Sequence, residues 1–553
     1  MNTFIVTGVP IYLVHGRPPV EALGVRDCRV ACAGSIADVE ASLPPDASLF
    51  TPATGAIMPA FVDAHQHAFL VAVDPFTDVL HRKARTIPDL LGVLRTLIPR
   101  HNAHDDGHAW LRFHGYAPME FAEHRSPTAM ELDAVCTDTP LHVLSRTFHE
   151  SAVNSAGLAA LGIGRHTPDP PGGRIMRNRR GQPTGVLLEA SSFAAERTSR
   201  PRESDGLWRD RLAVHGQNLL ANGIATIGDA AVPMHLSSTV VEVLAAVGVA
   251  AHPLLVSERI DEPGFVAGAT AKVLADGGEY CHLCMTRQQV ARVMRASMRA
   301  SLGPDGVTAR AVGRRSGMPR RESDHLWHSG VRYPTGDAFG RVLTQACEAG
   351  SSVAVHAVGN GAVDAVLAAL KVDRTLADQV ALRVEYAMVV DADLINRLGV
   401  AGLPVVSQPG FLSAYGHELA LVPVPSPLQL MPFRAMQDAG VPLVFSSDYP
   451  ASDLSPWRTV ASAVQRTDRF GTVIGPDQVL SVAEALVAHT VAGAEVLGEA
   501  TAGRLIVGGP ATMIWSDTDP YTARPEDFGT ITTTATWVAG ELRFGTQPSR
   551  TSR

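Results

Sequence analysis

FVDAHQHAF, residues 61–69, is the stretch that decides the fold. Apolar residues lead into Asp63, His65 and His67, and alternate side chains of an extended strand point to the same face. We therefore expect these three polar side chains to project together, which would place two imidazoles where they form half of a metal site. If no further ligands follow, the segment is only a strand end whose histidines form hydrogen bonds or face solvent.

Seven further strand-like apolar runs follow, and helical patterns that close near a glycine lie between them. Alternation of strands and helices is typical of a parallel sheet wrapped by helices. Because there are eight such units, the pattern predicts an α/β fold, a (β/α)8 TIM-like barrel. The eight runs cover residues 60–67, 224–230, 249–256, 270–278, 351–359, 381–389, 403–411 and 441–450.

Both ends of the chain carry short β-rich segments that are too thin to stand alone. We expect residues 1–57 and 496–553 to build one composite β-sandwich, and residues 58–495 to form the barrel. The interval between the first two barrel strands, about residues 70–220, is far longer than a crossover needs. A large inserted subdomain is therefore predicted after the first barrel strand.

Composition and charge exclude several classes of function. With 47 Lys and Arg against 55 Asp and Glu, the net charge is −8, and no global positive field would hold nucleic acid or an anionic membrane. Six scattered cysteines indicate a reducing compartment. The N-terminal segment lacks the features of a secretory signal, and no apolar run approaches the roughly 18 residues of a membrane span. We expect a cytoplasmic protein that acts on small molecules, with a possible homo-oligomer paired through a sandwich edge.

Polar residues end several of the eight runs, at the end of the barrel where catalytic groups sit. Two histidines of one strand, a third across the barrel and a carboxylate form a nitrogen and oxygen set that suits Zn²⁺, and also Mn²⁺ or Fe²⁺. The candidate metal ligands are His65, His67, His356 and Asp448. A bound metal lowers the pKa of water towards ~7, and Asp448 is the candidate that takes the proton and delivers it to a leaving nitrogen.

Each candidate also has an ordinary structural explanation. His356 could be a core histidine satisfied by the backbone, and Asp448 could form a turn before Pro450. Lys272, on the fourth run, could be a lysine at the barrel rim. Their shared position at the same ends of separate runs favours a functional site.

Seven ordered segments resemble the amidohydrolase superfamily, specifically amidohydrolase family 3, the YtcJ-like branch. The resemblance covers nearly the whole chain, and Ala60 replaces a glycine of the family's first motif. It implies a barrel with a composite β-sandwich and a metal-dependent hydrolase acting on carbon–nitrogen bonds. The segments are MPAFVDAHQH, PLHVLSRTFHESAVNSAGLAALGI, PPGGRIMRNRRGQPTGVLLEA, KVLADGG, VAVHAVGNGAVDAVL, RVEYA and SSDYP.

The sixth strand departs from the family pattern R-[IV]-E-H, because Tyr386 stands where the histidine is usual. A neutral phenol is a poor zinc ligand, so one ion, most simply Zn²⁺, is favoured over two. Lys272, a further catalytic and metal-ligating candidate, would bridge a second ion only with a carboxylated amine. Tyr386 would orient the substrate carbonyl or donate its O–H to a developing oxyanion.

Two features lie outside this set. His149 matches a family histidine in the inserted segment and would help to bind substrate, unless it only packs within the insertion. Cys281 and Cys284, in CHLC, could be a redox pair, extra metal ligands or small residues that pack a loop near the active-site mouth.

The sequence thus predicts a metal-dependent amidohydrolase that cleaves an amide or related C–N bond of a small molecule, of the N-acyl or N-formyl amine type. A deaminase or cyclic-amidine hydrolase is the alternative on the same barrel, since such a site also suits attack on a C=N carbon. A non-catalytic barrel scaffold, suggested by Tyr386, is the alternative from another class.

Overall fold

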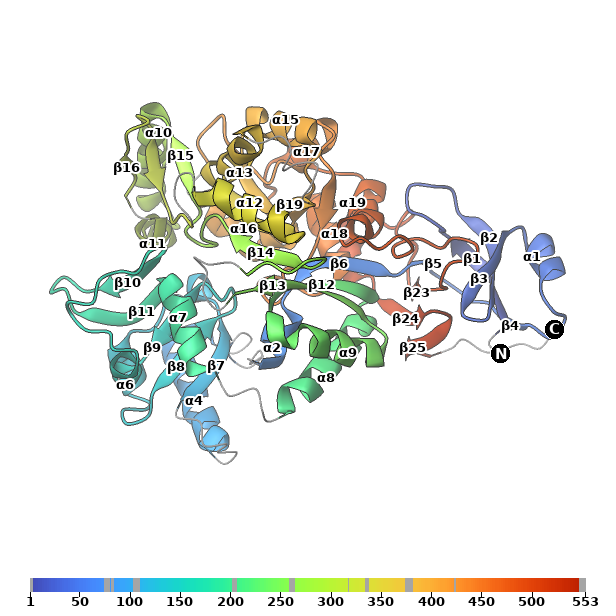
Figure 1. Cartoon of the computed structure of the whole chain (residues 1–553), viewed down its shortest axis with the longest axis horizontal. Helices are drawn as coiled ribbons and strands as arrows, with labels where there is room; N and C mark the ends of the chain where they lie inside the picture. The colour runs from blue at the N-terminus through green and yellow to red at the C-terminus, as the bar shows by residue number, and fades with distance from the viewer. Residues whose placement is uncertain are drawn as a thin grey trace.

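The computed structural model describes residues 3–73, 80, 84–102, 110–200, 206–257, 264–316, 318–333, 338–372, 381–421 and 424–546. Three parts follow one another along the long axis of the molecule (Figure 1). A sheet built by both ends of the chain lies at one end, the barrel lies in the middle, and two insertions of the barrel lie at the other end.

Eight parallel strands form the barrel, and each overlaps one of the eight predicted runs. The predicted (β/α)8 fold is therefore confirmed. Two backbone hydrogen bonds join the first strand to the loop after the eighth: Asp448 N–H donates to the His65 carbonyl at 2.9 Å, and His67 N–H donates to the Tyr449 carbonyl at 3.0 Å. In order of pairing the strands are β6 (Phe61–Gln66), β12 (Ile224–Pro233), β13 (Ala250–Val256), β14 (Thr270–Leu274), β18 (Ser352–Gly359), β19 (Leu382–Val390), β20 (Val405–Ser407) and β22 (Leu443–Phe445).

The helices around the barrel end as the glycine pattern predicts. Gly248 and Gly402 follow α9 (Ser237–Val247) and α15 (Ala392–Ala401) with φ of 100° and 61°, a left-handed backbone that glycine adopts without steric cost. The other outer helices include α8 (Leu207–Ala221), α12 (Ala338–Ala349), α13 (Asn360–Val372), α16 (Gly410–Leu421), α17 (Phe433–Asp438), α18 (Pro456–Gln465), α19 (Val482–Ala488) and α20 (Val491–Val496).

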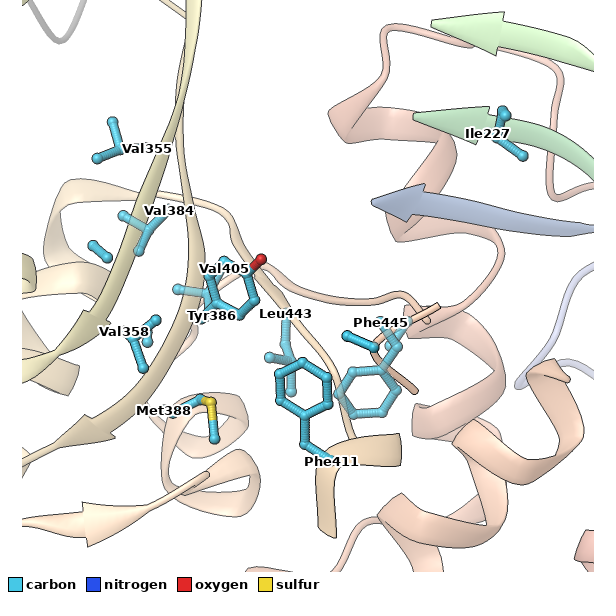
Figure 2. Close-up of a cluster of buried hydrophobic side chains, with 14 of the residues drawn as sticks. Ile227, Val355, Val358, Val384, Tyr386, Met388, Val405, Phe411, Leu443 and Phe445 are labelled. Carbon is cyan, nitrogen blue, oxygen red and sulfur yellow. The ribbon is translucent and has the colours of Figure 1, made fainter. Parts of the chain in front are cut away.

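Barrel strands buried on both faces explain why the sequence shows continuous apolar runs there. All six residues of β6 and all nine of β19 are buried. Apolar side chains of neighbouring strands, among them Val355, Val384 and Val405, pack together with Phe445 (Figure 2). Tyr386 lies in the same cluster with its ring beside Phe411, and its hydroxyl is the polar tip of an otherwise apolar side chain.

The two ends of the chain share one sheet. Its strands pair in the order β25-β24-β23-β5-β1-β2-β3, with β4 on β1. Phe50 of β4 contacts Trp537 of β24 edge to face at 5.2 Å, so distant strands cover one apolar cluster. The strands are β1 (Phe4–Ile11), β2 (Val20–Arg26), β3 (Arg29–Gly34), β4 (Ser48–Phe50), β5 (Ala56–Pro59), β23 (Met513–Ser516), β24 (Thr533–Val538) and β25 (Glu541–Gly545); α1 (Ile36–Ser42) packs on this sheet.

A five-stranded sheet, ordered β10-β11-β9-β8-β7, forms the first insertion. Asn154 joins the start of β8 to the start of α6. Its side-chain oxygen accepts hydrogen bonds from the N–H of Leu141 and from the N–H of Gly157. The elements are β7 (Leu111–Tyr116), β8 (Leu141–Ser145), β9 (Glu150–Val153), β10 (Gly173–Arg177), β11 (Pro183–Glu189), α4 (Ile87–Asn102), α5 (Ala129–Asp133), α6 (Ser155–Ala160) and α7 (Ala190–Ser199).

A second insertion, which the sequence pattern did not predict as a sheet, lies between β14 and β18. It contains the small antiparallel sheet β15 (Leu283–Met285), β17 (Trp327–Ser329) and β16 (Arg320–Arg321), with α10 (Arg287–Ser301) and α11 (Gly306–Ser316). Among the described helices, none has the length and apolar character needed to cross a membrane.

Candidate active site and metal centre

Three of the expected metal ligands meet at the seam between β6 and β22. Asp448 Oδ1 lies 3.0 Å from His67 Nε2 and 3.3 Å from His65 Nε2. Ligand atoms of all three side chains lie within 4.8 Å of one another. His65 and Asp448 are buried, whereas the side chain of His67 is 14% exposed. The arrangement suits a divalent metal with nitrogen and oxygen ligands.

Glu385 and Arg383 fix the orientation of His65 from β19. The Nδ1–H of His65 donates to Glu385 at 2.5 Å, and Arg383 donates to the other oxygen of the same carboxylate at 2.6 Å. Burial works to raise the pKa of Glu385, but Arg383 and His65 outweigh it and hold that pKa well below its usual range. Because Nδ1 carries the proton, Nε2 is the nitrogen that faces the cluster with a lone pair.

Asp63, the first polar residue of the FVDAHQH segment, holds the loop that carries Asp448. Its carboxylate accepts from Ser447 N–H at 3.0 Å and from the Ser447 hydroxyl at 2.5 Å. The residue next to Ser447 is Asp448, with φ of 50°. Asp63 is therefore a positioning residue that ties the first barrel strand to the last.

Lys272 projects from β14 into the same centre. Its Nζ lies 3.1 Å from His65 Nε2 and 5.6 Å from the centroid of the Tyr386 ring. Burial lowers the pKa of Lys272 to about 8, so a fraction of its side chain is the uncharged amine near neutral pH. Lys272 is therefore a buried residue of the centre and does not snorkel from the rim.

Tyr386 lies between His65 and His356. Its hydroxyl donates to Asp448 Oδ2 at 3.2 Å and lies 3.4 Å from His65 Nε2, and its ring is 4.5 Å from the His356 ring. Burial and the neighbouring carboxylates raise the pKa of Tyr386 well above its usual range, so the phenol stays protonated. It is a hydrogen-bond donor in this centre and a poor ligand for a cation.

The backbone at Tyr386 explains how two consecutive residues reach one histidine. Side chains of successive strand residues point to opposite faces, yet both Glu385 and Tyr386 approach His65. Tyr386 and Ala387 adopt φ of 82° and 45°, and the pairing of β18 with β19 shifts register after Tyr386. A left-handed backbone at a bulky residue is uncommon and is typical of functional sites.

His356, the fourth expected ligand, ends outside the cluster formed by His65, His67 and Asp448. Its Nε2 is buried without a hydrogen-bond partner among the described residues. Burial, with the positive groups nearby, lowers its pKa well below the usual value, so the imidazole is neutral. A neutral imidazole with an unpaired buried nitrogen is in the form that binds a metal.

His149 enters the barrel mouth from the first insertion. Its ring lies 5.4 Å from the His356 ring, and its Nδ1–H donates to Glu189 at 2.7 Å. Burial works to lower the pKa of His149, but Glu189 outweighs it and raises that pKa. His149 is thus held by Glu189 on the cavity wall over the site.

Two glycines after β14 allow Glu189 and His149 of the first insertion to lie close to the barrel backbone. A Cβ at Gly277 would stand 2.7 Å from the Glu189 carboxylate, and one at Gly278 would stand 2.7 Å from the His149 ring. The preceding Asp276 accepts backbone N–H bonds from Val358, Gly359 and His282, all at 2.9 Å. The ADGG segment therefore joins the barrel to both insertions at the edge of the site.

A cavity of about 510 Å³ opens on this centre and is bordered there by His149, His356, Tyr386 and Asp448. Both arginines of its wall are paired with carboxylates, Arg146 with Glu120 and Arg469 with Glu418, and Glu279 of the wall accepts from the Thr147 hydroxyl at 2.9 Å. Apolar side chains from both insertions and from the barrel form most of the remaining wall, including Leu283, Met285, Val290, Met388, Phe411 and Val424.

The residues present fit a divalent ion. His65, His67 and Asp448 supply two nitrogens and a carboxylate, His65 is fixed through Glu385, and His356 keeps an unpaired nitrogen nearby. Asp229, which also ends a predicted run, accepts from Phe69 N–H and so supports the backbone after β6. The sequence patterns did not single out Glu385, Arg383 or Glu189, although RVEYA contains the first two.

The chain is similar to known proteins over most of its length. The sequence model described as the amidohydrolase family matches residues 53–544. The chain is 28% identical over 539 residues to an N-substituted formamide deformylase of Arthrobacter pascens, which covers 95% of each chain. It is 25% identical over 513 residues to the putative amidohydrolase YtcJ of Bacillus subtilis strain 168, with 89% of each covered. The crystal structure of an uncharacterized metal-dependent hydrolase from Pyrococcus horikoshii OT3 has a TM-score of 0.63 at 20% identity, over 95% of this chain and 99% of that one, which shows a common fold.

Proposed function

This chain belongs to the amidohydrolase family, and from that premise we propose that it hydrolyses N-formyl or N-acyl amines with a bulky apolar substituent on nitrogen, using one zinc ion. The family makes the chain a metal-dependent hydrolase of carbon–nitrogen bonds in small molecules, as the motifs predicted. The choice of substrate, metal and ion number is the proposal. It rests on one observation: the cluster of His65, His67 and Asp448 borders, through Asp448, a cavity with a mainly apolar wall.

The cavity supports the apolar substituent. Its volume of about 510 Å³ is in the range of small-molecule sites. Because Arg146 and Arg469 are already paired with carboxylates, neither supplies an uncompensated charge for an ionic substrate. The relative named as an N-substituted formamide deformylase supports a formyl or small acyl group at the reacting end.

A single ion is supported by the sixth strand. His65, His67 and Asp448 would hold the ion, with His356 as the further candidate ligand. Tyr386 stays protonated at the place where a second ion would need a ligand. When bound, the ion polarises the substrate carbonyl and makes water nucleophilic at neutral pH.

The protein side chains have separate tasks in the reaction. Burial works to raise the pKa of Asp448, but His65, His67 and Lys272 hold it below its usual value, so the carboxylate is ready to accept a proton from the attacking water. Asp448 then delivers that proton to the leaving nitrogen. Tyr386 and His149 both border the cavity, and they would turn a hydrogen-bond donor to the substrate oxygen as negative charge develops on it.

The test uses metal-loaded protein and a panel of N-alkyl and N-aryl formamides and acetamides. We expect release of formate or acetate together with the amine, and faster turnover as the apolar substituent grows. D448N should lower kcat/KM by roughly 10²- to 10⁴-fold with the fold retained. Ammonia release from heterocyclic amines or amidines, without amide hydrolysis, would overturn the proposal in favour of the deaminase alternative. Protein that binds no metal and cleaves neither class would restore the scaffold alternative.

A further inference from the structure

A second group of potential metal ligands lies in the second insertion. His282 Nε2 and His328 Nδ1 are 2.9 Å apart, and Cys284 Sγ lies 3.5 Å from the first and 3.2 Å from the second. These three residues form the other cluster of ligand atoms within 4.8 Å of one another in the described part of the chain. His282 and His328 are buried, and Cys284 is half-buried.

Strand geometry builds the cluster. Cys284 of β15 pairs directly with His328 of β17, so their side chains lie side by side on one face of the antiparallel pair. His282 is two residues before Cys284 and projects to the same face. An H-x-C segment on one strand and a histidine on its neighbour therefore present three ligands without any distortion of the backbone.

The distances match a tetrahedral ion. With Zn–N of about 2.05 Å and Zn–S of about 2.3 Å, ligand atoms lie roughly 3.3 Å (N to N) and 3.6 Å (N to S) apart. The observed 2.9, 3.2 and 3.5 Å are within a few tenths of an ångström of those values. Opening by that amount would admit an ion.

The surroundings resemble those of a bound metal site. The other nitrogen of His328, Nε2, donates to Asp324 at 2.9 Å, the carboxylate–histidine arrangement that orients metal-binding imidazoles. A Cβ at Gly361 would stand 2.5 Å from the His282 ring and 2.7 Å from Cys284 Sγ. The start of α13 can therefore lie this close to the cluster only because residue 361 is glycine. Asn360 clamps the Cys284 backbone with two hydrogen bonds of 2.9 and 3.0 Å.

We propose that His282, Cys284 and His328 bind a transition-metal ion, zinc by the chemistry of one thiolate and two imidazoles, at a site separate from the hydrolytic centre. The three protein ligands leave one tetrahedral position for water. This ion fastens β15 to β17 beside the start of α13, which directly follows the strand that carries His356.

The site has a consequence for the cavity. Cys281, Leu283 and Met285 alternate with the ligands along the chain and line the cavity on the opposite face of β15. An ion on the ligand face therefore fixes the strand whose other face lines the cavity. This explains the two cysteines of CHLC: Cys281 belongs to the cavity wall and Cys284 to the metal site.

Cobalt spectroscopy separates the two metal sites, because the hydrolytic centre formed by His65, His67 and Asp448 contains no cysteine. Metal-free protein reloaded with Co²⁺ should show a thiolate-to-cobalt charge-transfer band in the near ultraviolet. C284S should lose this band, and C281S, the matched control on the other face of the segment, should keep it. The double variant H65A/H67A should also keep the band while losing hydrolysis.

A measurement on the wild-type chain covers the case in which C284S does not fold. Zinc should protect Cys284 from alkylation, mapped by mass spectrometry, and removal of zinc by a chelator should expose it, with Cys281 as the internal reference. Absence of the cobalt band in wild type, its persistence in C284S, or alkylation of Cys284 that is unaffected by zinc would each overturn the proposal. None of these outcomes depends on which amide the hydrolytic centre cleaves.

Discussion

Replacing Glu385 by glutamine tests how the proposed hydrolytic centre is held together. The variant keeps the shape of the side chain but removes the charge between His65 and Arg383, two contacts of 2.5 and 2.6 Å. Arg383 retains its hydrogen bonds to the carbonyl oxygens of Ala64 and Val496, so the fold should survive. The loss falls on His65, whose Nδ1–H no longer faces a carboxylate.

The size of the effect follows from this geometry. Loss of the partner of a metal-binding histidine weakens metal binding by about 10- to 100-fold, equivalent to about 1.4 to 2.7 kcal/mol. We expect E385Q to lose metal at correspondingly lower chelator concentrations, and excess metal to restore most of its hydrolysis.

The assay is metal content by elemental analysis after dialysis against graded chelator, with hydrolysis measured on the same samples. E484Q, which removes a partly exposed carboxylate paired with Arg434 at 2.6 Å, is the matched control and should behave as wild type. Metal affinity of E385Q equal to that of wild type would refute the inference that Glu385 orients a metal ligand.

Three further results are expected. Y386F should lower kcat by roughly 10²- to 10³-fold with metal content unchanged, because the hydroxyl that contacts Asp448 is lost, and an unchanged kcat would contradict this role. L283E should raise KM about tenfold or more for amides with long apolar substituents but little for small ones, which initial-rate kinetics would show. Burial lowers the pKa of His489 to about 4, so the unfolded chain takes up a proton at this residue before the folded chain does, and the stability present above pH 6.5 is lost as the pH falls towards 4. For His489 alone the loss between pH 7 and pH 5 is about 2 kcal/mol, and denaturant titration should show a shallower pH dependence in H489Q.

The barrel was predictable because its strands leave a local signal. A parallel strand buried on both faces has a continuous apolar sequence, and each of the eight predicted runs overlaps one barrel strand. The meeting of His65, His67 and Asp448 followed from the rule that polar residues at the carboxyl ends of barrel strands share one end of the barrel. The family suggested by the motifs is confirmed by the match over residues 53–544.

The partners of these residues gave no such signal. Glu385 and Tyr386 are consecutive, and in a regular strand their side chains would point to opposite faces of the sheet. Both contact His65 because the backbone at Tyr386 is left-handed. Glu189 reaches the centre from an insertion, through contacts that depend on two glycines elsewhere in the chain. His282 and His328 are 46 residues apart and meet only because β15 and β17 pair.

The seam at which the barrel closes also sets the order of events during synthesis. Asp63 and Ser447, whose hydrogen bonds fasten the two sides of the seam, are 384 residues apart. A growing chain therefore contains His65 and His67 long before Asp448, the third residue of their cluster, leaves the ribosome. From the role proposed for Asp448 we expect that a nascent chain shorter than about four-fifths of the full length does not hydrolyse substrate, and that hydrolysis begins only when the first and last barrel strands meet.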